Sequence, residues 1–285
     1  MECLEDRALL SASAIFSQAT GILRIKGDGG SDTVNIEGTG ALGGAAVYIN
    51  GGHVGDYTDV RGIRVSLGAG DDRLDIGALR INGNMTVNMG SGADEFFMDN
   101  TPDIGPNPDG DVIIGGNLRV KMGGDVGDLV DWTTNSVNSG IVVTGSVSLP
   151  KVTDISFNGN GGTYAVQNQD LRIQGNLKIS MSQWGDVNGD GRNALIDDLN
   201  VLNRTTIRGS KSFDRMIITD SRFTGPFTAK LGQGQNNFDL DDPEGPNWFG
   251  NSFSLIGKGF METYDASPAN VFNGSISVKG IENVI

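Results

Sequence analysis

The chain has 285 residues and a net charge of −14 at pH 7, from 35 acidic and 21 basic residues. This charge disfavours nucleic acid and anionic membranes as partners, and it makes divalent cations the natural counter-ions. The single cysteine, Cys3, excludes an internal disulfide framework. No apolar stretch approaches the roughly 18 residues that a membrane-spanning helix needs.

The composition favours a turn-rich β protein. Glycine accounts for 44 residues, about twice its usual share of roughly 7%. Most of the acidic residues are Asp rather than Glu. Because Glu favours helices whereas Asp favours turns and caps, we expect an all-β fold with almost no helix.

The N-terminal segment LEDRALLSA (4–12) resembles the LEPR-XLL-type segment found near the start of large bacterial surface proteins, with Asp6 where that family has proline. The resemblance implies export and a repeat-rich surface domain behind the segment. We therefore expect an N-terminal export or surface-associated segment over 1–20 and a single β domain over 21–285. The alternative is a short amphipathic stub with no such role.

From residue 22 the chain alternates apolar and polar residues on either side of a Gly/Asp turn, as in ILRIKGDGGSDTVNIEG (22–38) and GIRVSLGAGDDRLDIG (62–77). Alternation with β-branched residues between Gly and Asp is typical of paired strands. Variable polar stretches follow these units, so we expect the loops to lie on one side of the fold.

A short phrase recurs as GNMTVNM (83–89), GNLRVKM (116–122) and GNLKISM (175–181). One strand cannot bury its apolar face alone, so the copies must stack on one another. The spacing predicts a right-handed parallel β-helix, a β-solenoid with irregular rungs of about 20–34 residues. Its interior would contain columns of apolar residues that end in Met89, Met122 and Met181.

Between the repeats at 175 and 225 the phrase is missing over 50 residues. Leu195, Leu199 and Leu202 fall in a possible helical register within this gap. We therefore expect a loop or short helical insertion near 184–204.

Two turns have the pattern G-x-G-x-D and bring Asp72 and Asp94 to equivalent places. Such turns can aim backbone carbonyls and a carboxylate at one point, which suits calcium. They resemble the nonapeptide calcium repeats of RTX-type proteins, although here the units lie 20 or more residues apart. The alternative is that tight turns simply require Gly and Asp.

The sequence GDVNGDGRNALID (185–197) matches the ligand spacing of an EF-hand-type calcium loop. It resembles the calcium loop of a dockerin module, which also ends in Asp. The resemblance implies ligands at positions 1, 3, 5, 7 (through a carbonyl) and 12 of the loop: Asp186, Asn188, Asp190, Arg192 and Asp197.

These features together predict a non-catalytic structural or adhesive module, secreted or at the cell surface, with calcium as its cofactor. Surface polysaccharide or other cell-surface proteins are the expected partners. Basic residues at 204–215 (Arg204, Arg208, Lys211 and Arg215) indicate a solvated face rather than a glycan site on so acidic a chain. The alternative function is a polysaccharide lyase or glycoside hydrolase of the β-helix type, for which no catalytic residues stand out.

Overall fold

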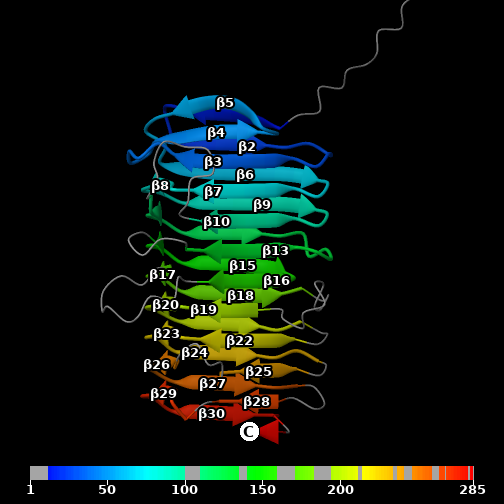
Figure 1. Ribbon diagram of the computed structural model, residues 1–285, viewed down its shortest axis with the longest axis vertical. Coiled ribbons are helices and arrows are strands. Elements are labelled where there is room, and N and C mark those ends of the chain that lie inside the picture. The colour runs from blue at the N-terminus through cyan, green and yellow to red at the C-terminus, as the bar shows by residue number, and fades with distance from the viewer. Residues whose placement is uncertain are drawn as a thin grey trace, which may run out of the picture.

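The computed structural model describes residues 12–99, 110–134, 140–158, 171–182, 194–210, 214–233, 236–240, 246–258, 263–266, 268–281 and 283–284. All regular structure in these ranges is β, as the sequence predicted. Three long sheets run along the molecule, and the chain contributes to them in turn (Figure 1).

Sheet A has eleven strands: β1 (Ser13–Ser17), β2 (Ile22–Lys26), β6 (Gly62–Ala69), β9 (Met85–Ser91), β12 (Leu118–Lys121), β15 (Val147–Val152), β18 (Leu177–Met181), β21 (Thr205–Arg208), β24 (Phe227–Lys230), β27 (Phe253–Ile256) and β30 (Ile276–Lys279).

Sheet B has twelve strands: β3 (Thr33–Gly38), β4 (Ala45–Ile49), β5 (Gly52–Tyr57), β7 (Arg73–Gly77), β10 (Glu95–Asp99), β13 (Leu129–Thr133), β16 (Asp154–Asn158), β19 (Ala194–Asp197), β22 (Arg215–Thr219), β25 (Asn237–Asp239), β28 (Thr263–Asp265) and β31 (Asn283–Val284).

Sheet C has eight strands: β8 (Arg80–Ile81), β11 (Val112–Ile114), β14 (Ile141–Val143), β17 (Leu171–Ile173), β20 (Leu199–Val201), β23 (Arg222–Phe223), β26 (Trp248–Phe249) and β29 (Val271–Phe272).

From β6 onward the chain passes through sheets A, B and C in that order, and we call one such pass a coil. Each strand pairs in parallel with the equivalent strand of the next coil, for example β9 with β12 and β10 with β13. At the N-terminal end, β1 pairs antiparallel with β2, and β4 and β5 extend sheet B as antiparallel strands. These antiparallel strands cover the first coil, so its edge is not left open for pairing with another chain.

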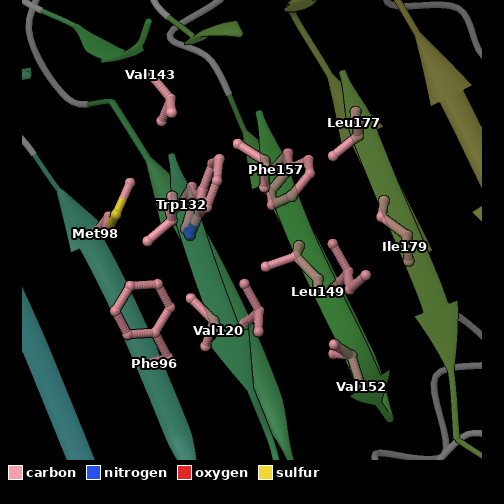
Figure 2. Packing of buried hydrophobic residues seen from close by; sticks show 14 of the residues in the cluster. Phe96, Met98, Val120, Trp132, Val143, Leu149, Val152, Phe157, Leu177 and Ile179 are labelled. Carbon is pink, nitrogen blue, oxygen red and sulfur yellow. The ribbon is translucent and has the colours of Figure 1, made fainter. Parts of the chain in front are cut away.

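The core consists of columns of side chains from equivalent positions in successive coils. Along sheet A, Val65, Val87 and Val120 pair in register and are buried. Met89 and Met122 are fully buried, and Met181 is partly buried against the same core. Figure 2 shows side chains of this interior, including Val120 and Leu149, from neighbouring strands. The predicted stacking of the repeats is confirmed.

Aromatic side chains fill the same columns in the C-terminal half. Phe227 of β24 and Phe253 of β27 stack with ring centroids 5.4 Å apart, and Phe223 and Phe249 of sheet C stack at the same distance. Nearer the middle, Trp132 and Phe157 stack at 4.6 Å (Figure 2). Offset or edge contacts of this kind add to the burial of the rings themselves.

The prediction of a loop or short helical insertion near 184–204 is wrong for the part of this segment that the structure describes. Residues 194–197 and 199–201 form strands β19 and β20, and 205–208 form β21, which pairs with β18 and β24. The gap between the repeats therefore contains one more coil. It went unrecognised because β21 reads TTIR, so a buried Thr205 stands where other coils have an apolar residue.

Polar side chains link the coils where the chain passes from sheet C to sheet A. The backbone N–H of Asn117 donates to Asn84 Oδ1 (2.7 Å), that of Ser146 to Asn117 Oδ1 (2.8 Å), and that of Asn176 to Ser146 Oγ (3.1 Å). These residues are the polar positions of the repeated G-N/S phrase, so the repeat encodes a corner as well as a strand.

No helix among the described residues is long and apolar enough to cross a lipid bilayer.

We predict that Leu118→Ala lowers the free energy of unfolding by about 2–5 kcal/mol, because it leaves a cavity in a fully buried column between Met85 and Val147. Arg119→Ala, one residue away on the outer face, should change it by no more than about 0.5 kcal/mol. Chemical denaturation of both variants checks this, and equal effects would contradict the assignment of inner and outer faces.

Candidate functional site: a buried ladder of aspartates

The corner between sheets A and B places one aspartate immediately before a sheet B strand in each of four coils. Asp32, Asp72, Asp94 and Asp128 precede β3, β7, β10 and β13, and all four are at most 3% exposed. We call these residues the aspartate ladder. It contains two predicted site residues, Asp72 and Asp94, and brings them to neighbouring coils.

Three carboxylates of the ladder, those of Asp72, Asp94 and Asp128, accept a hydrogen bond from the backbone of the preceding coil. Asp32 accepts instead from the N–H of Asp28 in its own turn and from the Asn50 amide. The N–H of Asp32 donates to Asp72 Oδ1 (2.8 Å), that of Asp72 to Asp94 Oδ1 (3.0 Å), and that of Asp94 to Asp128 Oδ1 (3.2 Å). At the end of this run, Asp128 Oδ2 accepts from the N–H groups of Gly124 and Asp125. The ladder therefore joins four coils through their main chain.

The glycines of the turns are needed because successive coils approach closely here. Gly68 and Gly90 have φ values of +122° and +129°, and they pair with each other across the sheet. A β-carbon on Gly90 would overlap the carbonyl oxygen of Gly68. The G-x-G-x-D pattern is thus a requirement of backbone conformation and stacking, with the aspartate as its polar link.

The second carboxylate oxygens of Asp72 and Asp94 are buried and have no hydrogen-bond partner. Desolvation is the largest cause of a rise in the pKa of Asp72 from 3.8 to about 6, and in that of Asp94 to about 7. The hydrogen bonds from the backbone oppose this rise, whereas the neighbouring carboxylates, including Asp128, add to it. Burial likewise raises the pKa of Asp128. At pH 7 the carboxyl group of Asp94 is therefore about half protonated, and that of Asp72 is half protonated near pH 6.

The carboxylates of the ladder are already engaged with the backbone. Calcium takes six to eight oxygen ligands, and each ladder carboxylate already uses at least one oxygen on a backbone N–H. In the described ranges no three Asp, Glu, His or Cys side chains come together as metal ligands. The turns do align from coil to coil, as shared ions would require, but calcium binding by Asp72 and Asp94 stays a prediction.

Most of the predicted dockerin-like loop lies outside the described residues, which omit Asp186, Asn188, Asp190 and Arg192. Its last predicted ligand, Asp197, is described. Asp197 ends β19, and its Oδ1 accepts a hydrogen bond from the Thr219 hydroxyl at 2.8 Å. Calcium binding by this loop also stays a prediction.

The same corner continues further down with Asn236, the last residue of the related turn GQGQN (232–236), and with Asp214, which the sequence did not reveal. The N–H of Asp214, immediately before β22, donates to Oδ1 of Asn236, immediately before β25, at 3.0 Å. No G-x-G-x-D pattern marks Asp214, and only its place before an alternating strand could have identified it. Asn236 shows that a neutral amide also serves in this position.

A pocket of about 400 Å³ opens on the antiparallel part of sheet B, lined by Glu37, Thr39, Tyr48, His53 and Asp56 among others. Glu37 is buried, whereas Asp56 is exposed and lies 3.0 Å from the Nε2 atom of His53. A shielded and a solvated carboxylate in one pocket is the combination that glycoside hydrolysis uses. The pocket is the place in the described structure where the enzyme alternative can be tested.

Comparison of the chain with models of protein families, with curated proteins and with solved structures finds no match.

We predict that the protein becomes less stable as the pH rises from about 4 to about 7. An aspartate with a raised pKa keeps its proton in the folded state, while the unfolded chain loses that proton above pH 3.8. The stabilisation is therefore complete below the unfolded pKa and lost as the pH passes the folded one. The free energy of unfolding, measured by denaturation at several pH values, should fall by an amount on the order of 3 kcal/mol over this range.

Asp94→Asn should flatten this pH dependence and raise the stability at pH 8, because the amide oxygen still accepts the Asp72 N–H without becoming charged. Asp71→Asn is the matched control, since Asp71 is exposed in the same turn and accepts the N–H of Ala93. A steep pH dependence that survives in Asp94→Asn would contradict the role given to the ladder.

Proposed function

We propose that this chain is a non-catalytic structural and adhesive module, secreted or displayed at a bacterial cell surface. One observation carries the proposal: equivalent strands stack in parallel through all three sheets, giving an elongated body with long, flat outer faces (Figure 1). Meanwhile the polar residues at its corners hydrogen-bond to the backbone of neighbouring coils. Such a body suits display and attachment.

We also infer that the three sheets form a right-handed β-helix. The repeated order A, B, C in parallel strands supports this, since parallel crossover connections are right-handed in about 98% of cases. Only the antiparallel strands β1, β4 and β5 depart from the pattern, and they cover the first coil.

The extracellular location is supported by sequence features. The segment 4–12 resembles the N-terminal segment of large bacterial surface proteins. The single cysteine is compatible with this location. A fold held by ladders of hydrogen bonds and stacked side chains does not depend on disulfides.

Calcium remains part of the proposal on the strength of the loop 186–197, whose spacing provides a ligand at each required position. An ion that binds only the folded chain stabilises it, because its binding free energy adds to that of folding.

Added calcium should raise the melting temperature, and chelation with EDTA should lower it. At a calcium concentration about 100 times the dissociation constant, the free energy of unfolding would rise by about 2.7 kcal/mol. Asp186→Ala should abolish the part of the shift that comes from the loop 186–197, and any remaining part that Asp94→Asn removes would come from the turns of the ladder. A melting temperature that is unchanged by calcium and by EDTA would exclude the calcium part of the proposal.

The second candidate is an enzyme acting on polysaccharide, favoured by the pocket that contains Glu37 and Asp56. Incubation with acidic glycans, followed by assays for reducing ends and unsaturated products, separates the two functions. We expect no product from the wild-type protein. Product that disappears in Glu37→Gln would replace the scaffold proposal with the enzyme.

A further inference from the structure

Charge is segregated between the sheets. The strands of sheet A contain ten Lys and Arg side chains, all exposed, and no Asp or Glu. The strands of sheet B contain ten Asp and Glu side chains and only two basic ones, Arg73 and Arg215. Nearly half of the basic residues in a chain of net charge −14 therefore lie on one face.

One column on the outer face of sheet A contains Arg24, Arg64, Arg119 and Lys178. Arg24 pairs with Arg64, and Arg64 pairs with Thr86, which in turn pairs with Arg119. Ser148 stands between Arg119 and Lys178. From Arg24 to Lys178 the column thus presents cations with hydroxyl side chains between several of them, and beyond Lys178 it continues with Thr and Ser side chains.

A second column two residues further along the strands contains Lys26, Lys121, Arg208, Lys230 and Lys279. Asn88 pairs with Lys121, Arg208 with Lys230, and Ser180 with Arg208. The register of the strands places this column beside the first, at about 7 Å. The ten strands of sheet A from β2 to β30 are separated by nine steps of about 4.8 Å. The two columns together therefore form a basic strip about 43 Å long.

The cations of the strip have no acidic partners in the described structure. The ion pairs found there join His53 with Asp56, and Arg73 with Asp75 and Glu95, all on sheet B. Surface cations that served only solubility would be interspersed with acids, as on most protein surfaces. Segregation on one flat face instead indicates a partner of opposite charge.

From this geometry we propose that the outer face of sheet A binds a linear acidic polysaccharide along the axis of the coils. The inference rests on the proposed adhesive function and names its partner by chemical class. Carboxylate or sulfate groups of the glycan would pair with the Lys and Arg side chains. Its hydroxyl groups would hydrogen-bond to the Ser, Thr and Asn side chains between them.

Two other occupants fit the face less well. Single-stranded nucleic acid is usually held by stacking on aromatic side chains, and the outward positions of sheet A from β2 to β30 contain none. A second copy could present its acidic sheet B to this face. Sheet B, however, also has partly exposed aliphatic side chains at outward positions, such as Leu129 and Leu195, which offer the cations nothing.

The test measures binding of the whole chain to sodium polygalacturonate, dextran sulfate, neutral dextran and single-stranded DNA, at low and at physiological salt. We expect binding to at least one of the two acidic glycans, weakening with salt, and none to dextran. The two glycans distinguish carboxylate from sulfate recognition.

The triple variant Arg64→Gln, Arg119→Gln, Lys178→Gln should bind the glycan roughly tenfold more weakly, since three exposed ionic contacts are lost. The control Arg73→Gln, Arg80→Gln, Arg222→Gln removes three exposed cations from sheets B and C instead. It changes the net charge equally and should keep binding within about twofold. Circular dichroism and thermal melts confirm that both variants fold.

Equal losses in the two triple variants, no binding to either acidic glycan, or tighter binding to DNA would each overturn the inference. A further contradicting result would be that the protein binds no glycan but self-associates in sedimentation, and that the sheet A triple variant abolishes this self-association. These outcomes leave the scaffold proposal intact, because that proposal fails only if the glycans are cleaved.

Discussion

The structure depends on hydrogen bonds that join each coil to the next at the corners between sheets. Within a sheet, parallel pairing satisfies the backbone groups of every strand, but a turn leaves N–H groups without ladder partners. Here a short polar side chain in a neighbouring coil accepts them. Asn84 and Asn117 do this between sheets C and A, Asn247 between B and C, and the aspartate ladder between A and B. Stacking in register is thereby enforced at all three corners.

The three corners meet the same need with different chemistry. An amide accepts the backbone N–H without a charge, whereas the aspartate ladder brings carboxylates into a dry corner one above another. Asn236 fills the equivalent place lower down, so an amide is sterically acceptable there. The carboxylates therefore add a property that amides lack: they take up protons at the pH where they would otherwise repel one another, and the upper coils become sensitive to acidity.

The repeat phrases were enough to predict an all-β fold of stacked strands, because the alternation of residues and the Gly/Asp turns are local features. Even the inward side chains of β9, β12 and β18 could be assigned. The coil containing β21 was missed because Thr205 and the preceding Arg204 lack the repeated phrase, and only pairing with β18 and β24 reveals it. The aspartates of the ladder were recognised as special, but their hydrogen bonds to the next coil depend on stacking that no local pattern contains.

The basic face of sheet A illustrates the same limit in another way. Arg64, Arg119 and Lys178 are more than 50 residues apart in sequence, so no charge run marks them. Net charge gives no indication of this face for a related reason. In an elongated body, charges on other faces lie beyond the screening length of about 8 Å at physiological salt. A ligand on sheet A therefore responds mainly to the cations of that face, and the total of −14 describes the solubility of the molecule rather than its partner.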